Sequence, residues 1–229
     1  MSVPGYVRRM SRPRSHNEWT DPRIADYVAA HTAPPDEIQL DLIDETASHP
    51  MAQMQISADQ GALMAMLVRL VDARFVVEIG TFTGYSSLAM ARALPEGGRM
   101  LCCDVSEEYT AIARRYWERA GVADRIELRI APALDTLRSL PADTVIDLAF
   151  IDADKTAYRA YYEELLPRLK TNGLILIDNT LWSGAVVDDD VQDANTVALR
   201  ELNDFIVSDP RVDSYILPIS DGLTLVRKR

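Results

Sequence analysis

The stretch Phe75–Gly84, with the sequence FVVEIGTFTG, places a short apolar run directly before a turn bounded by two glycines. Short apolar runs of this kind are typical of buried strands in a parallel sheet. Gly80 permits a tight turn after the strand, and Gly84 lets the backbone and a following helix approach a ligand closely. A strand, a tight turn and a helix in this order predict an α/β fold.

The rest of the chain repeats this pattern. Apolar runs predict strands over 75–79, 99–103, 125–130, 145–151 and 174–178, and helices are predicted over 84–94, 106–120, 132–140 and 156–170. Strands separated by helix-length segments predict right-handed crossovers and a parallel sheet. After a helix over 195–208, strands over 212–218 and 222–227 flank the turn Ser220-Asp221-Gly222. This turn predicts an antiparallel hairpin at the edge of the sheet.

The segment before the first strand is predicted to be helical over residues 21–72. Ile24, Tyr27 and Val28 share one face of a first helix, and the proline pair at 34–35 opens a second, which extends to about residue 48. A third helix begins near Ser57, which lies at a capping-box spacing from Gln60. The apolar stripe of this third helix is predicted to comprise Leu63, Met66, Leu67 and Leu70.

Size and charge limit what the chain can be. Its 229 residues suit one sizeable domain, here residues 21–229, preceded by a basic arm over residues 1–20 with four arginines that we expect to be flexible. A net charge of −11 argues against nucleic acid as a partner. No apolar stretch approaches the length that spans a membrane, and we expect a cytoplasmic protein. The adjacent Cys102 and Cys103 are predicted to be buried free thiols.

The glycine turn predicts a particular type of cofactor. It lacks the Gly-x-Gly-x-x-Gly pattern of dinucleotide sites, because Phe82 stands where the second glycine would make room for a pyrophosphate. Glu78 precedes the turn and suits a ligand with an ammonium group. Asp104 ends the second strand, where it could accept hydrogen bonds from both ribose hydroxyls. Together these features favour S-adenosylmethionine over NAD, although each acid taken alone could simply cap a strand.

Polar residues at the ends of two later strands predict a metal site. Asp152 and the pair Asp178-Asn179 end neighbouring strands, and ligands of open α/β sheets bind beyond such carboxyl ends. Two carboxylates and an amide form an oxygen set suited to Mg²⁺. Lys155 lies close enough to Asp152 in sequence to act as a general base there. Trp182 follows and could form one wall of a substrate pocket or simply pack under a loop.

Asp154 is expected to point away from Asp152, toward solvent or a helix start. Tyr158, Tyr161 and Tyr162, on the predicted helix over 156–170, are expected to be packing and surface residues rather than ligands.

In these motifs the chain resembles the cation-dependent class I S-adenosylmethionine O-methyltransferase family, which includes catechol and caffeoyl-CoA O-methyltransferases. The resemblance extends from about residue 24 to residue 227. The segments on which it rests are Met54–Ser57, Val77–Ser86, Phe150–Lys155, Asp178–Gly184 and Leu217–Thr224. It implies a doubly wound, Rossmann-like, seven-stranded and mostly parallel sheet with an antiparallel C-terminal hairpin and helices on both faces.

The resemblance also implies roles for individual residues. Those expected to contact S-adenosylmethionine are Met54, Ile56, Glu78, Gly80, Tyr85, Ser86, Asp104, Val105, Ala133 and Asp152. Mg²⁺, or another divalent cation such as Ca²⁺ or Mn²⁺, is expected on Asp152, Asp178 and Asn179, with Lys155 as the base. The family pattern departs at Ala131–Leu134, where many relatives have glycine. Homodimers are usual in the family.

The sequence thus predicts methyl transfer to one hydroxyl of a catechol-like vicinal diphenol, with Lys155 and Asp152 as catalytic residues and Trp182 against the substrate. A small diphenol is preferred to a CoA thioester, because no basic cluster lies near the expected substrate loop. Two alternatives stay open at this point. One is an NAD-dependent oxidoreductase on a similar sheet, and the other is a small-molecule-binding protein that has lost catalysis.

Overall fold

The computed structural model describes residue 23, residues 27–28 and residues 30–229. The chain divides into two compact units, Met1–Pro34 and Pro35–Arg229. In the first unit, the His31 backbone N–H donates to the Tyr27 carbonyl over 3.1 Å and the two rings stack. The predicted basic arm and Ile24 of the predicted first helix lie outside the described residues. Every element below belongs to the second unit.

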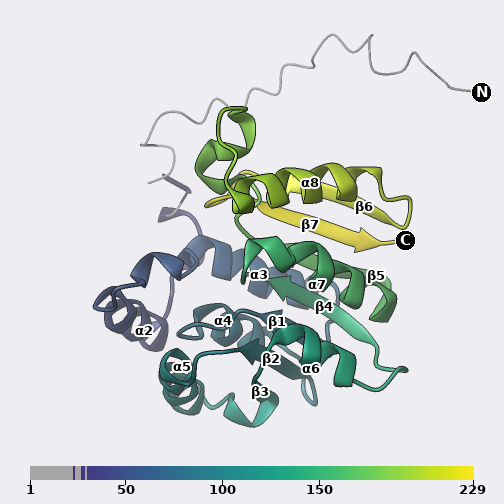
Figure 1. Ribbon diagram of the computed structural model, residues 1–229. Coiled ribbons are helices and arrows are strands. Elements are labelled where there is room, and N and C mark those ends of the chain that lie inside the picture. The colour runs from purple at the N-terminus through teal and green to yellow at the C-terminus, as the bar shows by residue number, and fades with distance from the viewer. Residues whose placement is uncertain (1–22, 24–26, 29) are drawn as a thin grey trace, which may run out of the picture. The chain divides into compact units, whose positions relative to one another are not determined.

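Seven strands form one sheet in the order β3-β2-β1-β4-β5-β7-β6 (Figure 1). Five of them are parallel, whereas β7 runs antiparallel to both β5 and β6. The predicted parallel sheet with an antiparallel C-terminal hairpin is therefore confirmed. The strands span β1 Phe75–Ile79, β2 Arg99–Asp104, β3 Ile126–Ile130, β4 Ile146–Ile151, β5 Leu169–Ile177, β6 Val212–Leu217 and β7 Leu223–Lys228.

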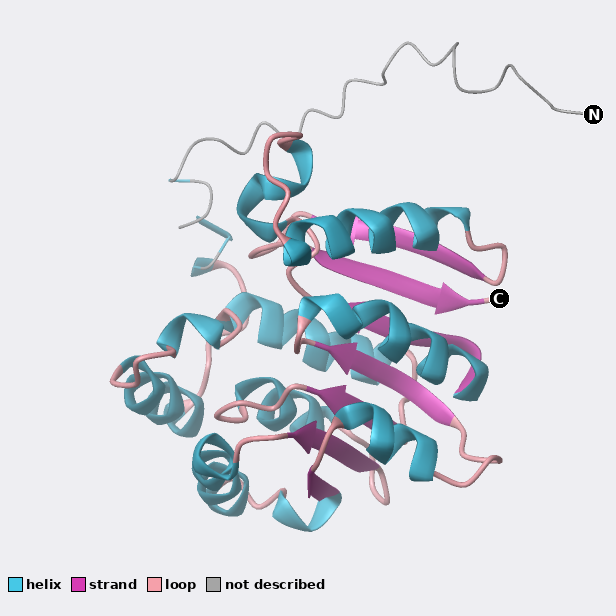
Figure 2. Cartoon of the chain, viewed as in Figure 1, coloured by secondary structure: helices cyan, strands magenta, loops and turns pink. Residues whose placement is uncertain are grey.

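Helices cover both faces of this sheet (Figure 2), as a doubly wound fold requires. One hydrophobic cluster joins the sheet to α2 (Glu37–Ala47), α3 (Ala58–Leu70), α4 (Tyr85–Ala93) and α5 (Glu107–Arg119). A second cluster joins the other face to α6 (Ala133–Ser139), α7 (Tyr158–Leu165) and α8 (Ala194–Ser208). Cys102 belongs to the first cluster and Cys103 to the second, because neighbours on a strand point to opposite faces. Both are buried free thiols, as predicted.

Short 3-10 segments occupy much of the remaining chain. They span η1 Ala52–Met54, η2 Ala123–Arg125, η3 Lys155–Ala157, η4 Leu166–Arg168 and η5 Trp182–Val187. In the described part of the chain, no helix has the length and apolarity needed to cross a membrane.

Helix α3 buries only part of the predicted stripe: Leu67 is buried and Leu63 packs partly buried against the core, but the other two members are exposed. Met66 and Leu70 are half or more exposed, whereas Met64 and Val68 are fully buried. The reason is Gly61, where an added Cβ would lie 2.8 Å from the Tyr85 ring. The missing side chain lets α3 approach α4 closely and turns toward it the face that contains Gly61, Met64 and Val68. Apolarity alone could not identify this face, since its contact point is a glycine.

Strand β5 begins earlier than predicted. The expected helix over 156–170 ends at Leu165, η4 follows it, and Leu169 already pairs with Ile146 of β4. The register then shifts, with Asn172 at a φ of 63° and Gly173 so close to β4 that a Cβ would lie 2.9 Å from the Asp147 carbonyl. The Asn-Gly pair therefore marks an irregularity within a strand and not the end of a helix.

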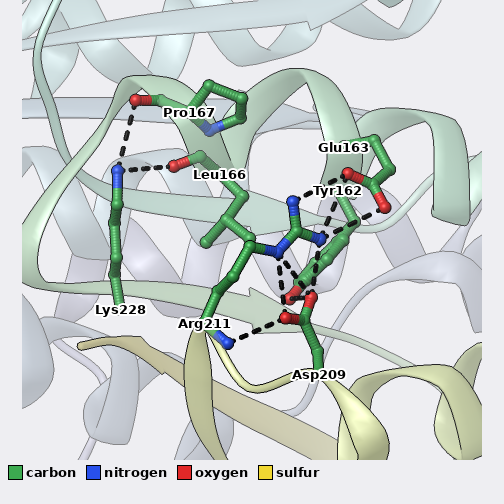
Figure 3. A network of polar contacts seen from close by, with 7 residues as sticks. All are labelled: Tyr162, Glu163, Leu166, Pro167, Asp209, Arg211 and Lys228. Carbon is green, nitrogen blue, oxygen red and sulfur yellow. Dashed lines mark hydrogen bonds and ion pairs between the residues drawn. The ribbon is translucent and has the colours of Figure 1, made fainter.

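A polar network fastens the C-terminal hairpin to the end of α7 (Figure 3). The Asp209 carboxylate accepts hydrogen bonds from the Tyr162 hydroxyl, at 2.9 Å, and from the Arg211 guanidinium, at 2.6 Å. Arg211 holds the pKa of Asp209 down at about 2, and it also contacts Glu163. Lys228 donates to three backbone carbonyls at and after η4. The hairpin is thus held at the end of the sheet opposite the glycine turn.

Candidate active site

One pocket of about 1000 Å³ opens at the carboxyl ends of β1, β2, β4 and β5. All but one of the site residues predicted from the sequence line it, and the exception is Glu78. The predicted residues in the lining are Met54, Ile56, Gly80, Tyr85, Ser86, Asp104, Val105, Ala133, Asp152, Lys155, Asp178, Asn179 and Trp182. The fold therefore brings to one cavity residues that are more than one hundred positions apart in the sequence.

The glycine turn is held in place by its surroundings. Gly80 has a φ of 90°, and a Cβ there would lie 1.9 Å from the Asp152 carbonyl oxygen, so no larger residue fits. Gly84, at a φ of 87°, belongs to the pocket lining, but a Cβ there would point away from the pocket and lie 2.5 Å from Ala113 of α5. This differs from the prediction that Gly84 makes room for a ligand. Its absent side chain lets the start of α4 pack against α5.

Asp104 braces the same turn. One carboxylate oxygen accepts hydrogen bonds from the backbone N–H groups of Thr81 and Phe82, both at 2.8 Å, and the other accepts from Ser106 at 2.8 Å. A carboxylate offers about four acceptor sites. The structure therefore leaves about one of them, on Oδ1, for a ligand hydroxyl, where the sequence prediction gave Asp104 both ribose hydroxyls.

Glu78 lies immediately beneath the pocket. On β1 it points to the opposite face from Val77 and Ile79, and its side chain is fully buried. Oε1 accepts a hydrogen bond of 2.6 Å from Ser86, which does line the pocket, whereas Oε2 has no hydrogen-bond partner among the described residues. Burial raises the pKa of Glu78 to about 8, against weaker opposing effects of Ser86, Cys102 and Thr81. A buried carboxyl with an unpartnered oxygen suits a cationic group of a ligand.

At the other end of the pocket, polar side chains converge on the Lys155 ammonium. Nζ donates to Asp152 Oδ1 at 3.0 Å, to Asn179 Oδ1 at 2.6 Å and to the Tyr158 hydroxyl at 2.5 Å. It also lies 5.7 Å from the centre of the Trp182 ring. Lys155 is buried, although it begins the short 3-10 segment η3 that follows β4. The predicted base and two predicted metal ligands are therefore direct neighbours.

The charge distribution at this end favours a cation. Burial, and next the nearby charge of Asp152, raise the pKa of Asp178 to about 7. Among the residues that the structure describes, no three His, Cys, Asp or Glu side chains are grouped as a metal site. The candidate set instead combines two carboxylates with the Asn179 amide oxygen, and Asn179 and Asp152 already direct oxygens at a cationic ammonium. Such an all-oxygen set fits a hard divalent cation.

The segment after β5 turns sharply around these ligands. Asn179, Trp182 and Ser183 have φ values of 56°, 48° and 51°, a conformation that costs free energy for residues other than glycine. The turn begins directly after Asp178, whose carboxylate accepts a hydrogen bond of 2.8 Å from the Asn179 N–H. Strain of this kind persists only where neighbouring contacts fix the backbone.

Sequence reasoning missed three features in or directly beside the pocket. Tyr158, expected to be a packing residue, contacts the Lys155 ammonium, and its position three residues after Lys155 on a helical segment was the available signal. The Gln60 amide is buried beside Asp178 and favours the ionised carboxylate. Asp221 contacts Asn179 across 42 residues of sequence. Asp154 is exposed, as expected, but it accepts a hydrogen bond from Tyr161 and lines the pocket.

Comparison with known proteins agrees with this geometry. The family model for O-methyltransferases matches residues 29–229. Caffeoyl-CoA O-methyltransferase 1 from Arabidopsis thaliana is 41% identical over 202 residues, which are 84% of this chain and 78% of that protein. Tricin synthase 1 from Oryza sativa subsp. japonica is 39% identical over 217 residues, 88% of this chain and 86% of that protein.

Among solved structures, the O-methyltransferase from Bacillus cereus, in complex with SAH, matches with a TM-score of 0.83 and 31% identity, covering 90% of this chain and 97% of that one. The family match covers every residue that lines the pocket. The chain belongs to the O-methyltransferase family and is an enzyme of that class.

Proposed function

We propose that this enzyme transfers a methyl group from S-adenosylmethionine to one hydroxyl of a catechol-like vicinal diphenol, with the help of a divalent cation. The observation that supports this most strongly is the position of Lys155. Its ammonium contacts Asp152 and Asn179 at one end of a pocket whose other end is formed by the glycine turn. A base, an oxygen cluster and a cofactor turn in one cavity match the needs of methyl transfer to an acidic hydroxyl.

The turn end of the pocket would hold the methyl donor. Glu78, with its free Oε2, and Ser86 suit the ammonium of the methionine part, and Asp104 has acceptor capacity for a ribose hydroxyl. Met54, Ile56, Val105 and Ala133 supply apolar surface for the rest of the donor. The donor supplies an electrophilic methyl group on sulfur, and the protein holds it beside the acceptor oxygen. Such positioning can contribute roughly 7–11 kcal/mol.

Lys155 would take the proton from the acceptor hydroxyl. In the structure its Nζ lies within hydrogen-bond distance of Asp152, Asn179 and the Tyr158 hydroxyl. A divalent cation held by Asp152, Asp178 and Asn179 would acidify the acceptor hydroxyl. Its charge would also disfavour the positively charged form of the nearby Lys155. The Trp182 ring, near Nζ, would form a wall for a planar acceptor.

The charge of the lining favours a small acceptor over a CoA thioester. Among the residues that the structure describes, five carboxylates line the pocket, those of Asp104, Asp152, Asp154, Asp178 and Asp221, against one cationic side chain, that of Lys155. A CoA thioester is a polyanion because of its phosphates, and like charges in a cleft oppose its entry. The relatives named for caffeoyl-CoA make this a direct comparison to test. Homodimer formation and a cytoplasmic location stay predictions from the sequence.

The test follows the transfer of a labelled methyl group from S-adenosylmethionine to ortho-diphenols and, in parallel, to a CoA thioester of a hydroxylated aromatic acid. We expect transfer to the diphenols, loss of it in chelator, and its return when Mg²⁺ is added back. Lys155→Ala should lower kcat by a factor of 100 or more, within the range of about 10²–10⁴ for general bases, while the Kd for the donor changes little. Undiminished transfer in chelator would exclude the cation, and an unchanged kcat would exclude Lys155 as base.

The two alternatives make different predictions. An oxidoreductase would bind NAD, which the absent middle glycine and the family membership both oppose. A binding protein without catalysis would bind the donor and give no turnover with any acceptor, although Lys155 and the oxygen cluster are all in place. Calorimetry with S-adenosylmethionine and with NAD separates the first alternative, and turnover separates the second.

A further inference from the structure

We propose that Asp221, at the turn between β6 and β7, is a positioning residue that sets the Asn179 amide with its oxygen toward the cation site. The inference rests on the proposed function, because it concerns the same oxygen cluster. It assigns a role to a residue from the last hairpin of the chain, which does not contact the Lys155 ammonium itself. This role has three structural parts, namely the amide, the backbone of the turn and the fit between the two segments.

The first part is the orientation of the amide. Asn179 Nδ2 donates to Asp221 Oδ2 over 3.3 Å, while Asn179 Oδ1 accepts from the Lys155 ammonium over 2.6 Å. The two ends of an amide have nearly the same shape, but only the oxygen can bind a cation. A carboxylate can only accept hydrogen bonds, so Asp221 favours the orientation in which the NH₂ group faces it, and the Lys155 ammonium on the other side of the amide favours the same orientation. If that acceptor is lost, rotation of the amide can present NH₂ to the cation site.

The second part is the backbone that holds Asn179. Asp221 Oδ1 accepts a hydrogen bond of 2.5 Å from the Ser183 N–H, and the Asp221 carbonyl accepts one of 3.0 Å from the Leu181 N–H. Asn179 and Ser183 are both at positive φ, a conformation that costs on the order of 1–3 kcal/mol at each such residue. The Asp221 side chain therefore contacts both the amide and the strained turn that aims it.

The third part is the close fit of the two segments. Gly222 has a φ of 88°, and a Cβ at this position would lie 2.8 Å from the Leu181 backbone nitrogen. The Gly222 carbonyl also accepts a hydrogen bond of 3.0 Å from the Thr180 N–H. A glycine next to Asp221 is thus what lets the hairpin turn press directly against residues 180–183. The Asp221 carboxylate therefore contacts Asn179 from a turn that is itself packed on and hydrogen-bonded to the segment after β5.

The experiment measures Mn²⁺ binding to the ligand-free protein through the electron paramagnetic resonance signal of free Mn²⁺. We expect Asp221→Ala to weaken Mn²⁺ binding by roughly 10–100-fold, the usual effect of removing a group that orients a metal ligand. The Kd for S-adenosylmethionine should change less than twofold. Asp221→Asn, which keeps an oxygen acceptor for Asn179, should weaken Mn²⁺ binding less than Asp221→Ala does. Asp213→Ala is the matched control, because Asp213 lies in the same hairpin but pairs with Arg227 and Arg229.

A second pair of variants separates orientation from folding. Asn179→Asp replaces the amide by a group with two oxygens, which has no wrong orientation. In the Asp221→Ala background this change should recover Mn²⁺ binding at least tenfold, whereas with Asp221 present it places two carboxylates side by side and should not improve binding. Such opposite effects are a coupling between contacting residues. A purely structural role of Asp221 predicts no recovery.

Three results would overturn the inference. One is equal Mn²⁺ binding by the parent and Asp221→Ala, and another is the absence of any recovery in the double variant. Both would leave the proposed function standing. The third is a parent protein that does not bind Mn²⁺ at all, which would remove the cation from the proposed function and the role of Asp221 with it. The first two results therefore differ from the third in what they exclude.

Discussion

Glu78→Gln is expected to stabilise the ligand-free protein and, at the same time, to weaken donor binding. Burial raises the pKa of Glu78 from 4.5 to about 8. Between these two values the unfolded chain releases a proton that the folded chain keeps, so the contribution of Glu78 to stability is present below pH 4.5 and is lost as the pH rises toward 8. Glutamine has nearly the same shape as glutamate but does not ionise, so the unfolding free energy of the variant does not fall in this way as the pH rises.

The magnitude follows from the distance between the working pH and 4.5. At about 1.36 kcal/mol for each whole pH step, the variant should gain about 1.4 kcal/mol over the parent near pH 5.5 and about 4 kcal/mol near pH 7.5. Urea unfolding of both proteins at the two pH values measures this difference. In the opposite direction, loss of a charge-assisted hydrogen bond to the donor ammonium should cost roughly 1.5–3 kcal/mol in binding, or about 10–150-fold in Kd.

Two results would refute this reasoning. If the difference in unfolding free energy between variant and parent were the same near pH 5.5 and near pH 7.5, Glu78 would not be protonated in the ligand-free fold. If Glu78→Gln bound S-adenosylmethionine as tightly as the parent, the unpartnered Oε2 would not serve the ammonium. Ser87→Ala is the control. It removes the buried Ser87 hydroxyl, which donates to the Gly84 carbonyl, and its effect on the unfolding free energy should not depend on pH.

Three further predictions concern single residues. Gly80→Ala should destabilise the fold by roughly 2–5 kcal/mol in urea unfolding and abolish donor binding in calorimetry, because its Cβ would overlap the Asp152 carbonyl; a stable variant that binds the donor would contradict the close approach. Tyr158→Phe should lower kcat about tenfold with less than a twofold change in donor Kd, because Lys155 loses a buried hydrogen bond of about 1 kcal/mol; an unchanged kcat would make Tyr158 a packing residue. Asp209→Asn should destabilise the protein by roughly 2 kcal/mol near neutral pH, measured by urea unfolding. Because the pKa of Asp209 is lowered to about 2, the difference in unfolding free energy from the parent should shrink as the pH falls below 3.8. A difference that persists at low pH would show that the charge of Asp209 is not what stabilises the network.

Much of the fold could be predicted because local patterns decide it. The run at 75–79, its glycine turn and the later apolar runs each follow from burial on both faces of a parallel sheet. The wrong details have physical causes that local patterns do not contain. Helix α3 turns its Gly61 face to α4 because of Tyr85, and β5 begins at Leu169 because β4 offers a partner there.

The candidate site was predictable to the same extent. Asp152, Asp178 and Asn179 directly follow strands β4 and β5, with Lys155 just beyond Asp152, so all four share a sheet edge, as the sequence indicates. Their hydrogen bonds were not predictable, because they depend on where the chain turns after each strand. The contact of Asp221 with Asn179 joins positions 42 residues apart through a hairpin whose docking depends on Gly222. Spacing along the chain gives no measure of such a contact.

The order of the strands along the chain has a consequence for synthesis. During translation, the residues of β1, β4 and β5 leave the ribosome before the hairpin that bears Asp221, and chains fold progressively from the N-terminal side. A nascent chain that has emerged only as far as Asn179 already contains the glycine turn and the oxygen donors, yet it lacks the turn that docks on residues 180–183. With the proposed cation site, nascent chains of increasing length should therefore acquire tight Mn²⁺ retention only once β7 has emerged.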